Sequence, residues 1–375
     1  MYALLKPLLF ALDPTTAHRI AMEALLPVEH LGVLRGALGA VLAPSDPRLR
    51  VKAMGLEFPS PIGLAAGLDK NGDRARAFEA LGFGHVELGT ITAQAQGPNP
   101  PPNLFRLPLD HALVNRLGFP NDGAAVVTSR IAKRRASMKI PVGVSIGKSR
   151  SVPLVAGELD GVLDDYVVSF RAAKAVADFV VVNVSSPNTK DLRALQAADV
   201  ARPLFEALAK EKGATPVLVK IAPDLDDAAI DALVDEAMRA GFAGVVATNT
   251  TIARTGLVTP AAQVEAIGAG GLSGRPLFTR ALAVVKRVRA RVGQGPCVIG
   301  VGGVDSTETA LAMLRTGADL VQAYTGFVYK GPFMPSAIAR GLLRKMEEEG
   351  AASLADLVHA SPPAKANGAG SHALA

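Results

Sequence analysis

The sequence FVVVNVSSPNT occupies residues 179–189 and contains two parts of opposite character. Residues 179–184 are almost entirely apolar, which is typical of a parallel strand buried on both faces. Residues 185–189 are polar and include a proline, so we expect the chain to leave the strand there. This unit, a buried strand that ends in a polar loop, recurs along the chain and decides the predicted fold.

Seven other short apolar runs alternate with helix-like segments. Eight strands in such an alternation favour a closed (β/α)8 barrel over an open sheet. No G-x-G-x-x-G motif opens the first strand–helix unit, which disfavours a doubly wound dinucleotide-binding sheet. The fold class is therefore predicted as α/β, a (β/α)8 TIM barrel with an N-terminal helical extension. The other predicted strands are Ile62–Ala66, His85–Gly89, Val142–Ile146, Val217–Ile221, Gly244–Thr248, Cys297–Val301 and Leu320–Tyr324.

Residues 1–44 precede the barrel and are predicted as short helices, with Asp13 as an N-cap and Pro14 at the first helical position. Two interpretations fit their apolar spacing: a helical hairpin packed on its own core, or an amphipathic pair that leaves apolar surface for lipid or a hydrophobic substrate. The first apolar run is too short to span a bilayer and has no signal cleavage site. We expect a protein kept in a bacterial-type cytoplasm. The first apolar face is Leu5, Leu8, Leu9 and Leu12.

Composition limits the function classes. Of the 375 residues, 49% are hydrophobic and 20% charged, which suits a large buried core. The only cysteine, Cys297, excludes a disulfide framework and a multi-cysteine zinc site, so we expect no metal centre. Tryptophan is absent and aromatic residues are 5%, which disfavours single-stranded nucleic acid as a partner. The net charge of +6 suits an anionic ligand, an anionic membrane or nucleic acid, and does not choose among them.

The domain boundaries follow from these patterns. Residues 1–44 form the helical extension, residues 45–349 the barrel, and residues 350–375 an Ala/Gly/Ser/Pro-rich segment that we predict to be a flexible tail. Two stretches interrupt the alternation of the barrel: a Pro/Asn-rich insertion at 91–120 and a Gly-rich loop at 249–276. Both follow the carboxyl end of a strand, where barrel active sites are assembled.

Polar motifs follow almost every predicted strand at its carboxyl end, so they should meet at one rim of the barrel. Gly302-Gly303 and the segment 324–326 follow strands seven and eight, the usual place of a barrel phosphate site, with Asp305 and Ser306 as candidate caps of the next helix. The alternative is that these glycines serve only the geometry of two turns.

Two side chains in these motifs point to chemistry. Lys220 lies inside an apolar strand, and a lysine directed into a barrel is costly unless it meets an anion, such as a flavin that becomes anionic on reduction. Ser186 could act as a base or nucleophile, or merely cap its loop. No histidine is near it in the sequence, so a Ser-His-Asp hydrolase is not indicated.

Seven motifs follow one another along the chain: GLAAGLDK (63–70), NRLGF (115–119), NVSSPNT (183–189), KIAPDL (220–225), ATNTT (247–251), GGLSGRP (270–276) and GVGG (300–303). In this order they resemble the quinone-dependent (class 2) dihydroorotate dehydrogenases. The resemblance covers about residues 1–345. It implies FMN as cofactor and oxidation of (S)-dihydroorotate to orotate in de novo pyrimidine (UMP) biosynthesis, with a membrane quinone as electron acceptor.

The resemblance also implies roles for single residues. Ser186 would remove the C5 proton of dihydroorotate while hydride leaves C6 for N5 of FMN. Since a serine is a weak base, a relay through Thr189 and a water near Phe119 is implied. A serine at this position, in place of a cysteine, separates class 2 from the soluble class 1 enzymes.

The implied binding sites overlap. The substrate site comprises Lys70, Asn115, Arg116, Leu117, Gly118, Phe119, Asn183, Asn188, Asn249 and Thr250. The FMN site comprises Ala66, Gly67, Leu68, Asp69, Lys70, Thr90, Ser145, Asn183, Lys220, Thr248, Gly274, Gly303, Tyr324 and Thr325. Ser145 departs from the family pattern, in which many members carry an asparagine with a longer reach. The quinone site comprises His18, Arg106 and Tyr324.

With this resemblance, the N-terminal helices would form a lipid-facing funnel for quinone on a monomeric protein, peripheral to the cytoplasmic face of the cell (inner) membrane. Two rival interpretations remain. A tRNA dihydrouridine synthase would use the positive charge for RNA, but it needs a cysteine acid, and Cys297 begins strand seven, at the wrong end. A module that only binds a phosphorylated ligand or a membrane would not require both Lys220 and Ser186.

Overall fold

The computed structural model describes residues 2–155 and 158–359, and its centre is a closed barrel of eight parallel strands. The strands are paired around the barrel in the order β3-β4-β7-β8-β9-β10-β12-β13, with β13 paired back to β3. The predicted TIM barrel is confirmed, and three strands have the predicted bounds. The strands are β3 (Ile62–Leu64), β4 (His85–Ile91), β7 (Val142–Ile146), β8 (Phe179–Asn183), β9 (Val217–Ile221), β10 (Gly244–Ala247), β12 (Cys297–Val301) and β13 (Leu320–Ala323).

Helices surround this barrel and bury one face each against the strands. In α11, for example, Ala281, Val284, Val285 and Val288 recur at helical spacing and are all buried. Each of these valines contributes roughly 1.5–3 kcal/mol by leaving water. The surrounding helices are α5 (Ala75–Ala80), α6 (Ala124–Arg135), α7 (Asp160–Lys174), α8 (Ala198–Lys212), α9 (Asp227–Arg239), α11 (Phe278–Val292), α12 (Thr307–Arg315), α13 (Thr325–Lys330) and α14 (Met334–Glu349).

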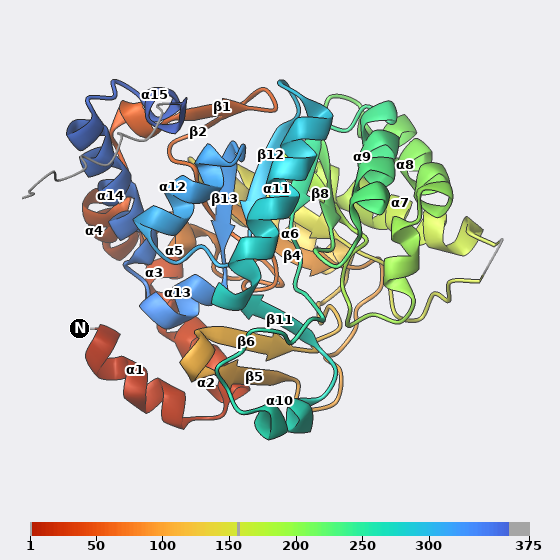
Figure 1. Ribbon diagram of the computed structural model, residues 1–375, viewed down its shortest axis with the longest axis horizontal. Coiled ribbons are helices and arrows are strands. Elements are labelled where there is room, and N and C mark those ends of the chain that lie inside the picture. Colours follow the sequence, from red (N-terminus) through yellow and green to blue (C-terminus); the bar gives the residue numbers. More distant parts are fainter. Residues whose placement is uncertain (1, 156–157, 360–375) are drawn as a thin grey trace, which may run out of the picture.

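A hairpin of β1 (Val51–Ala53) and β2 (Leu56–Phe58) lies at the amino-terminal end of the barrel (Figure 1). Its Phe58 is completely buried and packs edge-on against His85 and near Phe179. Burial lowers the pKa of His85 to about 3, so this imidazole is neutral. The hairpin was not predicted from the sequence. It closes this end of the barrel with apolar side chains.

The opposite end carries a three-stranded antiparallel sheet of β5 (Leu104–Leu107), β6 (Ala112–Asn115) and β11 (Gly271–Gly274), beside α10 (Ala261–Ile267) (Figure 1). The expectation that 249–276 is a loop was therefore wrong in part, because β11 lies in it and pairs with β6 from the insertion at 91–120. β5 and β6 form a local hairpin, whereas β11 pairs with β6 from a distant part of the sequence, which a local pattern cannot reveal. This roof sheet covers the carboxyl end of the barrel, where the polar motifs come together.

The N-terminal extension consists of α1 (Tyr2–Ala11), α2 (Pro14–Ala24), α3 (Leu26–His30) and α4 (Gly32–Leu42). The predicted cap is present: the Asp13 carboxylate accepts from the backbone N–H groups of Thr15 and Thr16, each at 3.0 Å. No single helix in the described ranges is long and apolar enough to cross a bilayer; Pro14–His30 and Gly32–Leu42 meet that criterion only together, across a 102° bend.

The two interpretations of this extension apply to different parts of it. Val28 and Leu42 are buried against the barrel helices, and the completely buried Glu29 pairs with Arg76 and Arg134 at 2.9 Å each. On α1, in contrast, Leu4 and Leu8 are 80% and 69% exposed. Thus α3 and the end of α4 are anchored to the barrel, while α1 presents apolar surface to its surroundings, and so does α4 at Val33 and Val41, which are 89% and 66% exposed.

The chain remains ordered beyond residue 349. Helix α15 (Leu354–His359) packs against α14 and buries Leu354 and Leu357. This helix lies within the segment that the sequence predicts to be a flexible tail. It was missed because six residues are too few to show a clear helical period of apolar residues. The rest of that prediction, residues 360–375, lies outside the described residues.

Candidate active site

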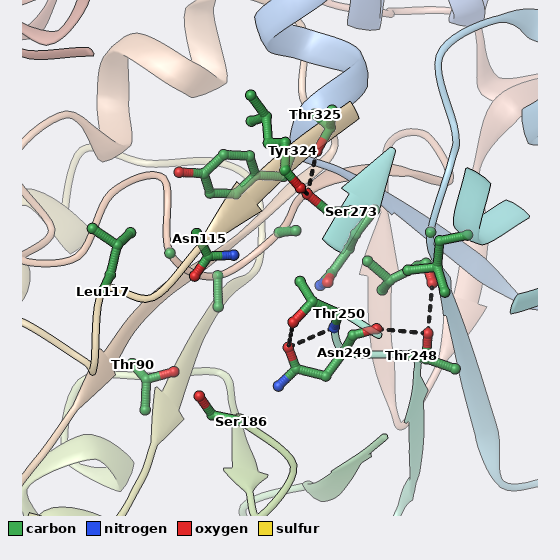
Figure 2. A pocket seen from close by; sticks show the side chains of 18 of the residues that line it. Thr90, Asn115, Leu117, Ser186, Thr248, Asn249, Thr250, Ser273, Tyr324 and Thr325 are labelled. Atoms are coloured by element: carbon green, nitrogen blue, oxygen red, sulfur yellow. Dashed lines mark hydrogen bonds between the residues drawn. The ribbon is translucent and has the colours of Figure 1, made fainter. Parts of the chain in front are cut away.

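A cavity with about 1060 Å³ of space between atoms opens at the carboxyl end of the barrel. Its lining includes residues that lie in or follow β3, β4, β8, β9, β10, β12 and β13, so motifs scattered over the whole barrel meet at one place. Figure 2 shows Thr90, Ser186, Asn115 and Asn249 around a common space, with Tyr324 and Thr325 on the side of the last strand. The convergence expected from the sequence is present.

The floor of the cavity contains the buried Lys220, which is 5% exposed. The expected anion is supplied by the protein itself: Oε1 of Glu87, on β4, lies 3.6 Å from Nζ of Lys220. Nε2 of Gln322 donates to the other oxygen of Glu87 at 2.9 Å. Glu87 and Gln322 were not identified from the sequence. The signal was available, since a glutamate within the apolar strand HVELGTI requires a partner for the same reason as Lys220.

Ser186 lies in the loop after β8, lines the cavity and is only 5% exposed. Its Oγ accepts from the backbone N–H of Asn188 at 3.2 Å, so it stabilises its own loop and faces the cavity at the same time. Phe119 lines the cavity as well. Thr189 is buried behind the lining, and its hydroxyl has no hydrogen-bond partner among the described residues.

Four asparagine side chains on the lining are linked in two groups. Nδ2 of Asn188 donates to Oδ1 of Asn115 at 3.0 Å. Nδ2 of Asn249 approaches Oδ1 of Asn183 at 3.3 Å and donates to Oγ of Ser185 at 2.9 Å. These bonds fix the orientation of each amide, because they decide which end is the donor. The result is a wall with donors and acceptors in set positions.

Lys70 is the cation on the cavity wall. Burial lowers the pKa of its amine to about 8, and the nearby carboxylate of Asp69 opposes that shift. Burial raises the pKa of Asp69 to about 6. The Asp69 carboxylate does not reach the cavity, since it accepts from the backbone N–H groups of Asp73 and Arg74 at 2.8 Å each. Asp69 therefore holds the loop that carries Lys70.

Five of the predicted site residues do not line the cavity: Leu68, Asp69, Arg116, Ser145 and Thr189. Arg116 points away from it and donates to the carbonyls of Ile267 and Ala269 at 2.6 and 2.8 Å. Ser145 is completely buried behind Thr90, and the two hydroxyl oxygens are 2.9 Å apart. These residues support the wall from behind. Ser273, Leu104 and Leu113 line the cavity and were missed, because they lie in or beside the unpredicted roof sheet.

Glycines form one end of the cavity, at Gly302-Gly303 and Gly326. A Cβ atom on Gly303 would lie 2.6 Å from Cβ of Phe278, and one on Gly326 would lie 2.2 Å from the carbonyl oxygen of Val304. Ser306 caps α12 with a capping box, as predicted. Asp305 is not the cap residue of α12; its carboxylate instead pairs with Arg275 at 2.9 Å. Backbone rather than side chains thus faces this end, which suits a phosphate group.

A second cavity, with about 1070 Å³ of space, lies between the N-terminal helices and the barrel. His18, Arg106 and Tyr324 all line it, among mainly apolar neighbours. Tyr324 also lines the first cavity, as do Leu104 and Leu113, so the two spaces adjoin. Burial, and then the charge of Lys70, lowers the pKa of His18 to about 3.

Arg106 holds α1 over this second cavity. Its guanidinium donates to the carbonyl of Leu12 at 2.8 Å and to that of Phe10 at 3.1 Å, and it lies 4.7 Å from the centre of the Phe10 ring. At the other end of the helix, the Tyr2 hydroxyl donates to the carbonyl of Val328 at 2.5 Å. Within the described ranges, no three His, Cys, Asp or Glu side chains are grouped as a metal site.

Comparison with known proteins places this site in context. A family model described as "Dihydroorotate dehydrogenase" matches residues 48–346. A protein of Rhodococcus opacus named "Dihydroorotate dehydrogenase (quinone)" is 49% identical over 360 residues, which are 96% of this chain and 99% of that protein. A Thermobifida fusca protein of the same name is 48% identical over 94% of each chain. The solved ligand-free DHODH of Eimeria tenella has a TM-score of 0.80 and 32% identity, covering 92% of this chain and 99% of that one.

Proposed function

The chain belongs to the dihydroorotate dehydrogenase family, and from that premise we propose that it oxidises (S)-dihydroorotate to orotate with FMN and transfers the electrons to a membrane quinone. The reaction would serve pyrimidine biosynthesis. The observation that carries this proposal is the pair of adjoining cavities: one polar, with Ser186 and Lys70 on its lining, and one mainly apolar beside the N-terminal helices.

The residues of the first cavity fit FMN. The glycines at 302–303 and 326 offer backbone N–H groups where a side chain could not fit, which suits the phosphate. Oε1 of Gln322, on the floor, is buried without a hydrogen-bond partner in the described part of the chain and can accept from a ring N–H, while Lys220 suits an electron-rich ring edge. When bound, FMN would accept the hydride from dihydroorotate, which carries both electrons of the oxidation. The other residues proposed to hold it are Ala66, Gly67, Thr90, Asn183, Thr248, Gly274, Tyr324 and Thr325.

The opposite wall suits dihydroorotate, a small cyclic diamide with one carboxylate. Lys70 would pair with the carboxylate, because an ammonium group that is largely removed from water gains most from an anionic partner. The four asparagines offer both donors and acceptors to the ring amides, and their mutual hydrogen bonds hold them in place before substrate arrives. Pre-set groups cost little to order when the substrate binds.

Ser186 is proposed as the base that takes the proton from C5. Its Oγ already accepts from the N–H of Asn188, a bond that stabilises negative charge on this oxygen. A free serine is a poor base, so the proton must move on. The unpartnered hydroxyl of Thr189, in the same loop, can receive it and pass it toward solvent. The C5–H bond is thus broken with the proton leaving by way of hydroxyl groups of this loop.

The second cavity is proposed to admit the quinone. Tyr324 lies between the cavities, so a quinone head beside it would be close to the flavin site. His18 stays neutral at physiological pH, because its pKa is lowered to about 3, and it can hydrogen-bond a quinone carbonyl without burying a charge. The exposed leucines of α1 suit lipid contact, which would make the protein peripheral to the cytoplasmic face of the cell membrane.

One enzymatic rival is weakened by the position of Cys297. A tRNA dihydrouridine synthase needs a cysteine acid in its active site, and Cys297 is buried in the apolar cluster that contains Phe58, at the amino-terminal end of the barrel. A protein that only binds its ligand is the rival of a different class. It is distinguished by turnover, which the following experiment measures.

The purified protein should be yellow, and dihydroorotate should bleach its flavin absorbance under anaerobic conditions. A ubiquinone or menaquinone analogue should then restore the colour, while fumarate should not. A protein that retains FMN but is not bleached by dihydroorotate would disprove the proposed substrate. Restoration by fumarate at the same rate as by quinone would disprove the proposed acceptor.

A further inference from the structure

A buried carboxylate lies under the cavity and has no role in the function proposed above. Glu87 is completely buried inside the barrel, and Lys220 is its only ion-pair partner among the described residues. We propose that Glu87 is a positioning residue that holds Lys220 on the floor of the cavity and sets the charge there, and thereby lowers the midpoint potential of bound FMN. This inference rests on the proposed binding of FMN.

The pair crosses the interior of the barrel. Glu87 is on β4 and Lys220 on β9, and β7 and β8 lie between these strands in the sheet. Gln322 comes from a third strand, β13, and donates to Oε2 of Glu87 at 2.9 Å. The ion pair therefore depends on these side chains across the barrel and not on hydrogen bonds between adjacent strands. The three side chains form a polar layer directly above the apolar cluster around Phe58 and Phe179.

Burial makes an unpaired charge in this layer costly. Breaking a buried ion pair by removing one partner is strongly destabilising, because the remaining charge is left without compensation. No other charged side chain lies within ion-pair distance of Glu87 in the described ranges. His85, two residues earlier on β4, cannot substitute, since burial lowers its pKa to about 3 and keeps it neutral. Glu87 and Lys220 are therefore expected to depend on each other.

The ion pair leaves both Glu87 and Lys220 able to form further hydrogen bonds. The separation of 3.6 Å is an ion pair but is longer than a hydrogen bond, and Oε1 of Glu87 has no hydrogen-bond partner among the described residues. The Lys220 ammonium lines the cavity on its other side. It can thus donate to a ligand above while it remains balanced by the carboxylate below. A lysine balanced only by its ligand would attract added electrons more strongly.

The sign of the effect follows from the charges. With Glu87 ionised, the floor carries one positive and one negative charge close together. Replacing Glu87 with glutamine keeps the shape and removes the negative charge, so the floor becomes positive. A positive charge beside FMN favours the form that holds two more electrons. The midpoint potential of the bound FMN should therefore rise.

The test is the midpoint potential of FMN in the full-length holoprotein, measured without dihydroorotate by equilibration with a reference dye. Glu87→Gln should raise it by about 30 mV or more, which is a tenfold change in the ratio of reduced to oxidised FMN for a two-electron couple. Glu236→Gln is the matched control. Glu236 is also buried, at 5% exposure, but pairs with Arg202 and Arg239 away from the cavity, so its loss should leave the potential unchanged.

A midpoint potential of Glu87→Gln within 10 mV of the wild type would overturn the inference. If that variant does not fold, the double variant Glu87→Gln/Lys220→Met decides the matter, because it removes both charges and should be recovered as folded protein. A double variant that also fails to fold would show that Glu87 is needed for a reason other than balancing the charge of Lys220, which would contradict the inference. A wild-type protein that holds no FMN, or is not bleached by dihydroorotate, would instead refute the proposed function.

Discussion

Lys70 offers a pH dependence that can be calculated from the structure. Burial lowers the pKa of its amine to about 8, against the opposing effect of Asp69. Only the protonated amine can pair with the substrate carboxylate. Since the pKa lies within the accessible pH range, affinity for the orotate anion should be nearly constant below about pH 7 and should fall as the pH rises through 8.

The magnitude follows from the titration of one group. At pH 7 about 90% of the Lys70 side chains are charged, and at pH 9 only about 10%, given a pKa near 8. The Kd of orotate should therefore increase about tenfold between these values. The two titratable neighbours do not change their charge between pH 7 and 9. Asp69, with a pKa of about 6, is largely ionised throughout this range, and His18, with a pKa of about 3, is neutral. The bound anion raises the pKa of Lys70, so binding at pH 9 should take up a proton.

The assay is a titration of the holoprotein with orotate, followed by the change in flavin absorbance, at several pH values from 7 to 9. Lys70→Arg is the control. An arginine stays protonated throughout, so this variant should bind more weakly overall but with an affinity independent of pH. A wild-type Kd that does not change with pH, or a variant that shows the same slope as the wild type, would refute the assignment of Lys70 to the carboxylate.

Three further substitutions test other parts of the site. Ser186→Ala should retain FMN but slow its reduction by dihydroorotate at least about 100-fold; a rate within threefold of the wild type would place the base elsewhere. Arg193→Lys should lower kcat about ten- to a hundredfold with little change in FMN content, because Arg193 fixes the catalytic loop by donating to the carbonyls of Ser185 and Thr250 at 3.0 Å each; an unchanged kcat would contradict this. Glu29→Gln should lower the free energy of unfolding by about 3–5 kcal/mol, seen as a lower urea midpoint, because two arginines lose their buried partner; an unchanged midpoint would show that this contact is dispensable.

Much of the barrel could be predicted because its strands are continuous apolar runs. Val142–Ile146 and Val217–Ile221 have the predicted bounds, since both faces of these strands are buried and each run ends where polar residues begin. The convergence of loops at one rim followed from the direction of the strands alone. Such features depend on local pattern and on the rules of parallel sheets, and both are visible in one sequence.

Features that depend on distant pairing could not be predicted. The roof strand β11 pairs with β6 through contacts such as Gly271 with Asn115, and neither strand has a clear alternation of its own. The strand HVELGTI shows that Glu87 needs a partner, but not which one, because Lys220 is on a strand across the barrel. The orientation of Arg116 also depends on tertiary contacts, because the carbonyls that it binds belong to a segment about 150 residues later.

If the two adjoining cavities serve separate half-reactions, a substitution in the second cavity should impair only the reaction with quinone. Ala17 is buried on α2 and lines that cavity, so Ala17→Phe should fill part of it. Thr15→Phe, on the same helix but exposed and away from both linings, is the matched control. Rapid mixing would measure anaerobic reduction of the flavin by dihydroorotate and its reoxidation by a quinone in each variant.

We expect Ala17→Phe to leave reduction by dihydroorotate within twofold of the wild type and to slow reoxidation by quinone about tenfold or more, while Thr15→Phe changes neither rate. Equal slowing of both half-reactions, or undiminished reoxidation by quinone in Ala17→Phe, would show that the cavities do not have separate roles.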